Sequence, residues 1–169
     1  MGSGKTLSLC RQVYREYKKG KKVISNMHFN FPYTPLTIEM LLEYDREDTD
    51  LQDCVLVIDE AHIYLDSRTS VSKKNRIISM FLVQTRKKNV HLYYTTQYFD
   101  QVDKRLRQNS DVVTRCRTIP YKQVGKVLIK ITYNTMMIKE EFGYRTKKTF
   151  FISNPFYNMY DTNQVIAFN

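Results

Sequence analysis

Residues 54–62 have the sequence CVLVIDEAH, in which five successive apolar residues are followed by the acidic residues Asp59 and Glu60. An apolar run without polar alternation is typical of a strand that is covered on both faces in a parallel sheet. The carboxyl ends of such strands are where open α/β sheets form their ligand sites. We therefore predict a buried parallel strand with an acidic site at its end. The alternative is a buried strand that simply runs into an acidic surface turn.

Strand and helix patterns alternate on both sides of this strand. Residues 6–19 place apolar side chains at the spacing i, i+3, i+4, i+7, which is one face of a helix. We expect further helices at 36–44, 72–88 and 101–109, and further strands at 21–29, 90–97 and 111–119. The alternation predicts the α/β class, with a central, mostly parallel sheet between helices.

The pattern changes at Gln123. From there on, the chain has strand-like segments at 126–134 and 145–153 with no clear helix between them. We expect these segments to form a β-hairpin appended to the core. The predicted organisation is therefore a core at 1–122 and a β-rich C-terminal extension of the same domain at 123–169.

The first six residues, MGSGKT, match the second half of the phosphate-binding loop G-x-x-x-x-G-K-[ST]. In this P-loop, backbone N–H groups surround the phosphates, the lysine reaches the β and γ phosphates, and the Ser/Thr hydroxyl binds Mg²⁺. The residues expected to bind ATP are Gly2, Ser3, Gly4, Lys5 and Thr6. The motif's first glycine and the strand that leads into it would precede Met1, so we expect the chain to begin inside its own motif. A chance match in a terminal tail is the alternative.

Two further strand ends would complete this site. Asp59 can hold Mg²⁺ together with Thr6, and Glu60 can orient and polarise the attacking water. Gln97 ends the strand-like segment YYTTQ. If that strand lies between the strands of the other two motifs, Gln97 would lie near the γ phosphate, where it could position water or respond to hydrolysis. His62, by contrast, is expected to be a polar residue at a helix entry rather than a catalyst.

Taken together, MGSGKT, VLVIDEAH and YYTTQ resemble, in order and spacing, the FtsK/HerA-like DNA translocases among the additional-strand P-loop ATPases. Within that group the chain is similar to the zonula occludens toxin-like proteins of filamentous phages and to viral genome-packaging ATPases. The segments 85–111, TRKKNVHLYYTTQYFDQVDKRLRQNSD, and 154–162, NPFYNMYDT, carry this narrower similarity. The resemblance implies a RecA-like core that hydrolyses ATP with Mg²⁺, and it implies the roles given above for Lys5, Thr6, Asp59, Glu60 and Gln97.

The resemblance also implies an arginine finger and a homo-oligomeric ring, because such an arginine acts on the nucleotide of a neighbouring subunit. Arg86, just before the strand that ends at Gln97, matches the place of this arginine. A solvated arginine in a basic turn is the alternative interpretation. Arg105 and Arg107 are further candidates, and both would also suit contacts with DNA or with a subunit.

The function that the resemblance implies is an ATP-dependent motor that moves DNA into a viral capsid. Two alternatives stay open: a zonula occludens toxin-like ATPase that assembles and extrudes filamentous virions, and a non-hydrolysing nucleotide-binding or DNA-binding module. The partners would be DNA and either a capsid portal or a membrane assembly complex. The sequence shows no transmembrane segment and no signal peptide. We therefore expect a protein of the host cytoplasm that associates with membranes only through partners or missing parts.

The charge distribution favours a polyanionic partner. The chain carries a net charge of +10, and residues 104–130 hold eight basic residues against one acidic residue. Such a basic block is typical of nucleic-acid binding, although a solvated charged face gives the same pattern. The cysteines lack the spacing of a zinc site or of a disulfide framework.

Overall fold

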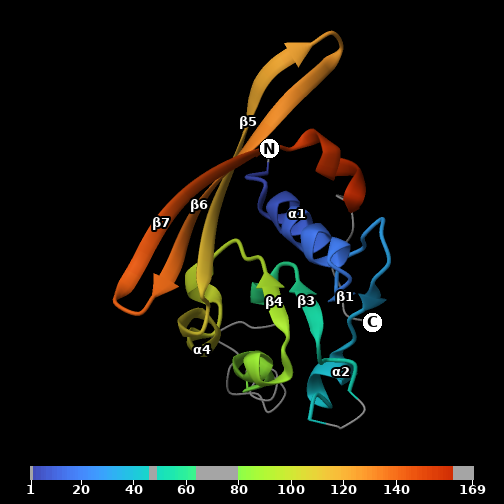
Figure 1. The fold of residues 1–169 in the computed structure, drawn as a ribbon, viewed down its shortest axis with the longest axis vertical. Coiled ribbons are helices and arrows are strands. Elements are labelled where there is room, and N and C mark those ends of the chain that lie inside the picture. Colours follow the sequence, from blue (N-terminus) through green and yellow to red (C-terminus); the bar gives the residue numbers. More distant parts are fainter. Residues whose placement is uncertain (1, 46–48, 64–79, 162–169) are drawn as a thin grey trace.

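The computed structural model describes residues 2–45, 49–63 and 80–161 (Figure 1). The named helices and strands, in chain order, are α1 (Lys5–Lys18), β1 (Lys22–Ser25), β2 (Thr34–Pro35), α2 (Ile38–Leu42), β3 (Cys54–Ile58), β4 (His91–Tyr94), α4 (Lys104–Gln108), β5 (Val112–Val124), β6 (Val127–Glu140) and β7 (Gly143–Ile152). Short 3₁₀ helices cover Ala61–Ile63, Thr85–Lys88, Phe99–Gln101 and Asn154–Met159. Residues 80–84 are helical, and the first part of the helix predicted at 72–88 lies outside the described residues.

Four strands form a parallel sheet in the order β2-β1-β3-β4. Every residue of β3 is buried, as expected for a strand that is covered on both faces. Its side chains alternate between two apolar clusters: Val55 and Val57 pack with α1, whereas Leu56 and Ile58 pack with α2 and α4. The predicted α/β class, with a parallel sheet between helices, is therefore confirmed.

The helix α1 covers one face of this sheet (Figure 1). Its apolar stripe, formed by Leu9, Cys10 and Val13, is buried against the strands. Just after the helix, Gly20 has a φ of 86° and donates its N–H to the Tyr17 carbonyl, as a glycine that terminates a helix does. Among the described residues, no helix has the length and apolar character needed to cross a bilayer.

The strands β5, β6 and β7 form a separate antiparallel sheet in that order. The hairpin predicted from 126–134 and 145–153 is therefore present, as β6 and β7. Figure 1 shows the β5–β6 turn at the top of the molecule and the β6–β7 turn at its lower left, with α1 beside the middle of the sheet. One antiparallel sheet thus extends well past the helix that it accompanies.

The strand predicted at 111–119 was expected in the core, but it does not join the parallel sheet. It forms the first part of β5 and pairs with β6. Arg115 and Arg117 are exposed on this strand. A strand with charged side chains at alternate positions does not fit a parallel sheet that is covered on both faces. β5 also runs across residue 123, where the sequence had led us to place the start of the C-terminal extension.

Candidate nucleotide site

The N-terminal loop enters α1 through Gly4, which has a φ of 86°. Glycine adopts this left-handed conformation without the steric cost that other residues incur. Space is also lacking, because a Cβ at Gly4 would lie 2.2 Å from the hydroxyl oxygen of Thr118 on β5. A Cβ at Gly2 would meet no atom within 4 Å. The last glycine of the predicted P-loop is therefore the position in the loop that requires glycine.

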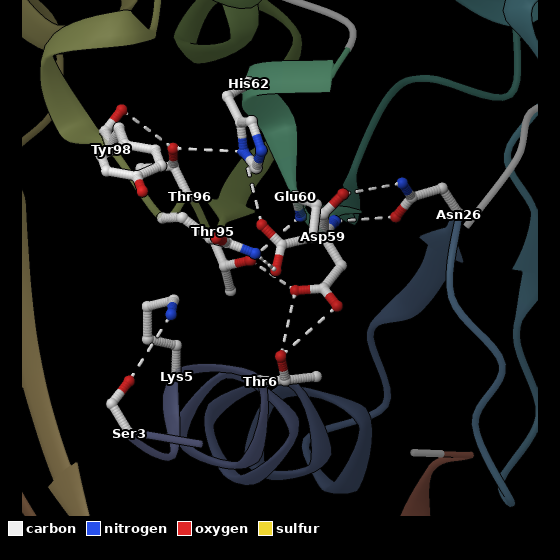
Figure 2. A network of polar contacts seen from close by, with 11 residues as sticks. Ser3, Lys5, Thr6, Asn26, Asp59, Glu60, His62, Thr95, Thr96 and Tyr98 are labelled. Carbon is white, nitrogen blue, oxygen red and sulfur yellow. Dashed lines mark hydrogen bonds and ion pairs between the residues drawn. The ribbon is translucent and has the colours of Figure 1, made fainter. Parts of the chain in front are cut away.

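The first turn of α1 carries Lys5 and Thr6. Lys5 Nζ donates to Ser3 Oγ at 3.5 Å, and Thr6 Oγ1 lies 3.4 Å from each carboxylate oxygen of Asp59, to which it donates (Figure 2). In the described part of the chain, no group of three or more His, Cys, Asp or Glu residues could hold a metal. A hydroxyl and one carboxylate fit the Mg²⁺ of nucleotide sites instead, where phosphates and water complete the ligand shell.

Thr95 joins the two acidic residues of the site. Its hydroxyl donates to Asp59 Oδ1 and accepts the backbone N–H of Glu60 at 3.0 Å. Its backbone also connects the two strand ends, because its N–H donates to the Ile58 carbonyl and its carbonyl accepts the N–H of Ala61. Thr95 is buried. Its hydrogen bonds fix the path of the chain from Ile58 to Ala61.

Asn26 holds the backbone of Asp59 from the other side. Its side-chain Nδ2 donates to the Asp59 carbonyl at 3.0 Å, and its Oδ1 accepts the Asp59 N–H at 2.8 Å. Neither Asn26 nor Thr95 was among the predicted site residues. A signal was present, however, since each directly follows a strand of the parallel sheet and the carboxyl ends of parallel strands meet at one edge.

The environment of Asp59 raises the pKa of its carboxyl group. Burial is the main cause, and the nearby charge of Glu60 adds to it. Hydrogen bonds from Thr95, from Thr6 and from the backbone N–H of Glu60 act in the opposite direction. A carboxylate held in this way is costly to keep charged without a cation, so a metal ion bound beside it would be stabilising.

Glu60 is held in an unusual backbone conformation, with a φ of 52°. Residues other than glycine take this conformation at a cost, and such strain is concentrated at functional sites. Its Oε1 accepts a hydrogen bond from Gln97 Nε2 at 3.4 Å. Its Oε2 is buried without a hydrogen-bond partner among the described residues, although it lies 3.3 Å from His62 Nδ1. The structure thus places a partly unsatisfied carboxylate beside Asp59.

Of the other residues considered, His62 and Gln97 lie at the site. His62 lies in the 3₁₀ helix after Glu60, and the hydroxyl of Thr96 is 3.5 Å from its Nδ1 (Figure 2). Gln97 follows β4, which pairs with β3. Among the described residues, no strand pairs with the other edge of β4.

The three candidate arginines bond to residues other than Asp59 and Glu60. Arg86 is exposed in the 3₁₀ helix that precedes β4 and forms an ion pair with Asp111. It therefore lies at the amino end of β4, whereas Gln97 follows the carboxyl end. Arg105 contacts Asp103 through two hydrogen bonds, and Arg107 donates to the Val102 carbonyl and pairs with Asp100. Their catalytic role stays a prediction.

Comparisons with known proteins bear on this arrangement. The family model described as zonular occludens toxin (Zot) matches residues 1–161. No curated protein matches the chain. A solved structure, the N-terminal domain of zonular occludens toxin from Neisseria meningitidis, covers 95% of this chain and 94% of its own at 16% identity, with a TM-score of 0.63.

Two other solved structures are more distant. The genome packaging NTPase B204 from Sulfolobus turreted icosahedral virus 2, in complex with ATP-gammaS, covers 82% of this chain and 92% of its own at 17% identity, with a TM-score of 0.45. The flagellar accessory protein FlaH from Methanocaldococcus jannaschii covers 86% and 85% at 10% identity, with a TM-score of 0.43.

The family match extends over nearly the whole chain, from the N-terminal loop through both acidic residues to the end of the described residues. The solved N-terminal domain shares the fold. The predicted resemblance is confirmed at the level of the family. This chain belongs to the zonular occludens toxin (Zot) family.

Proposed function

We propose that this chain hydrolyses ATP and uses the energy to move DNA. The observation that carries the first part is the connected cluster at the start of α1, in which Thr6, Asp59, Thr95 and Glu60 are linked by hydrogen bonds. Three separate segments of the chain supply these residues. Their convergence at the start of a helix, where phosphate groups are favoured, matches what ATP hydrolysis requires.

Each residue then has a chemical role. The backbone N–H groups of the loop and Lys5 bind the phosphates. Thr6 and Asp59 would hold Mg²⁺, which when bound neutralises charge on the phosphates. Glu60 accepts a proton from the water whose oxygen attacks the γ phosphorus, so that ADP leaves with the electrons of the broken P–O bond. Its backbone is fixed by the Thr95 hydroxyl and its side chain contacts Gln97.

The motor part of the proposal rests on charge and on the position of Arg86. The chain is strongly basic, and residues 104–130 hold eight basic residues against one acidic residue. Arg86 is exposed and lies at the opposite end of β4 from its own acidic pair. An arginine in that position is suited to a neighbouring subunit's nucleotide, which supports a ring of identical subunits.

Two biological settings fit such a motor: genome packaging through a capsid portal, and assembly and extrusion of filamentous virions at a membrane. Membership of the zonular occludens toxin family favours the second setting. The chemistry proposed for the site is the same in both.

DNA-stimulated ATP hydrolysis and movement can be tested together. We expect the protein to hydrolyse ATP faster when DNA is added, and to displace streptavidin from a biotinylated DNA end only when ATP is hydrolysed. Hydrolysis that does not respond to DNA, with no displacement, would exclude the motor and leave an ATPase of another kind. Absence of both ATP binding and hydrolysis would remove the proposal altogether.

A further inference from the structure

The β5-β6-β7 sheet has two faces, and one of them packs against the N-terminal loop and α1. Asn134 Nδ2 on β6 donates to Ser8 Oγ of α1 at 2.8 Å. On β5, Thr118 Oγ1 donates to the Ser3 carbonyl at 3.4 Å. The guanidinium of Arg11 on α1 lies over the ring of Phe151 on β7, 4.7 Å from its centroid. This inner face is therefore occupied by the chain's own helix and loop.

Side chains alternate along a strand, so the neighbours of these residues point to the opposite face. We call this the open face and define it by Arg115, Arg117, Tyr133, Lys148 and Phe150. Tyr133 is 40% exposed and Phe150 is 71% exposed. Their rings lie on adjacent strands with centroids 6.3 Å apart. Two aromatic rings are thus presented side by side to solvent in the middle of a sheet.

Cations lie in the same cross-strand row as this aromatic pair and in the row on one side of it. Arg117 on β5, Tyr133 on β6 and Phe150 on β7 form one cross-strand row. The adjacent row consists of Arg115, Thr135 and Lys148.

The open face also lacks opposing charge. The three strands contain one acidic residue, Glu140 at the end of β6, which pairs with Arg145 at 3.0 Å. No carboxylate of the three strands therefore offsets the positive charge of the two rows.

A hollow of about 450 Å³ lies on this face, with Arg115, Arg117, Tyr133 and Lys148 in its lining. A site of this composition has a specific ligand chemistry. Guanidinium and ammonium groups neutralise phosphates, and exposed aromatic rings stack on bases. In a duplex the bases already stack on one another, so the rings favour an unpaired strand.

We propose that the open face binds single-stranded DNA. Arg115, Arg117 and Lys148 contact backbone phosphates, and Tyr133 and Phe150 stack on bases. This inference names the DNA surface of the proposed motor and so rests on the proposed function. The same strands carry both sites: Thr118, next to Arg117 on β5, contacts the P-loop on the inner face. A DNA strand on the open face and a nucleotide at Lys5 would thus lie on opposite sides of one sheet.

Binding can be measured by fluorescence anisotropy with a labelled 20-nucleotide oligo(dT) in the absence of ATP. We expect Phe150→Leu to weaken binding about tenfold, as expected for one lost stacking contact, without changing the salt dependence. We expect Arg117→Gln with Lys148→Gln to lower the slope of log affinity against log salt by about 1.4, or about 0.7 for each phosphate contact. Tyr133→Leu is a second test of stacking. Circular dichroism checks the folding of each variant.

Matched controls change the same residue types elsewhere. Lys18→Gln at the end of α1 and Phe142→Leu in the β6–β7 turn should leave affinity within about twofold. Phe142 is 98% exposed, more than any other aromatic residue in the described part of the chain, so it is the one best placed to enter a bilayer. The inference is overturned if two results occur together: Phe142→Leu abolishes binding to anionic phosphatidylserine vesicles, and Phe150→Leu leaves the affinity for oligo(dT) unchanged. It is also overturned if duplex DNA or oligo(rU) binds as tightly as oligo(dT), or if Phe150→Leu changes the oligomeric state instead of the affinity.

Hydrolysis separates this inference from the proposed function. If DNA stimulates ATP hydrolysis by the Phe150→Leu variant and by the variant with both Arg117→Gln and Lys148→Gln as it does in the unchanged protein, the DNA surface proposed here is wrong and the proposed motor stands. The unchanged protein could also bind oligo(dT) without hydrolysing ATP. If these variants then bind oligo(dT) more weakly than the unchanged protein does, the proposed motor is wrong and the proposed DNA surface stands.

Discussion

The hydroxyl of Thr6 lies 3.4 Å from both carboxylate oxygens of Asp59, although 53 positions separate the two residues in the chain. The contact joins the first turn of α1 to the end of β3. It brings together the only two side chains for which the sequence predicted a metal role. The ATP site proposed for this protein depends on that junction.

Thr95 should be the residue whose loss disturbs both acidic residues at once, through the side chain of Asp59 and the backbone of Glu60. Thr95→Val keeps the shape but removes the donor to Asp59 and the acceptor for the Glu60 N–H. Because buried groups are left unpaired, we expect a loss of about 1–3 kcal/mol in the free energy of unfolding. Urea denaturation measures this loss, and ATP turnover should fall with it. Thr95→Ser, which keeps the hydroxyl, should restore most of both, and equal stability of the two variants would contradict this account.

Asn26→Ala should destabilise the protein through the backbone of Asp59. The change leaves a buried N–H and a buried C=O without the side chain that pairs with both. We expect the free energy of unfolding to fall by about 2 kcal/mol or more. Asn158→Ala, at an exposed position, is the control and should change urea denaturation by less than about 0.5 kcal/mol. A similar effect of both changes would show that Asn26 has no special role.

The raised pKa of Asp59 predicts a pH-dependent gain in stability for Asp59→Asn. The folded protein holds the Asp59 proton more tightly than the unfolded chain does, so charged Asp59 costs stability at pH values above the raised pKa. Asp59→Asn removes that cost, and urea denaturation at pH 7 should show a more stable protein. The gain should shrink as the pH falls below the raised pKa towards the usual value of aspartate, because both states then become protonated. A gain that is independent of pH, or a loss at pH 7, would show that the carboxylate is not penalised by burial.

Gly4→Ala should remove nucleotide binding, whereas Gly2→Ala should not. At Gly4 the added methyl meets the Thr118 hydroxyl and the backbone has a φ of 86°. The left-handed conformation alone costs an alanine about 1–2 kcal/mol. Binding of a fluorescent ATP analogue measures the effect. Thr118→Ala in the Gly4→Ala background relieves the contact but not the conformation, so it should restore binding only in part.

Arg86 can be tested by mixing two inactive proteins. Arg86→Ala and Glu60→Gln should each lower ATP turnover, and mixed rings should regain part of it. The recovered sites would combine Glu60 of one subunit with Arg86 of its neighbour. Lys87→Ala, in the same 3₁₀ helix, should stay active alone. If the mixture shows only the sum of the two separate activities, Arg86 does not act between subunits.

Local sequence signals predicted the framework of the site because they report local structure. The unbroken apolar run before Asp59 fixed β3 as a strand that is buried on both faces, and the spacing in 6–19 fixed α1. A P-loop lysine and threonine at the start of that helix then had to lie near the carboxyl end of a parallel strand. In the structure the Thr6 hydroxyl donates to the Asp59 carboxylate there.

The rest depended on pairings that a single sequence does not display. Thr95 and Asn26 matter because β4 and β1 are the two neighbours of β3, and strand order is not visible in a motif. β5 was assigned to the core because its apolar residues resemble those of a core strand, whereas its alternating arginines match the exposed face of an antiparallel sheet. The contact between Thr118 and the N-terminal loop joins residues 115 positions apart and follows from that pairing.

The central claim is that Glu60 activates water at a site that binds ATP through other residues, and Glu60→Gln tests it most directly. Two quantities are measured for the same protein: the affinity for a fluorescent ATP analogue and the rate of phosphate release from ATP. We expect affinity to stay within a few-fold of the unchanged protein and phosphate release to fall by about 10²-fold or more. Glu141→Gln, in the β6–β7 turn, should change neither. Phosphate release by Glu60→Gln at the rate of the unchanged protein would contradict the account.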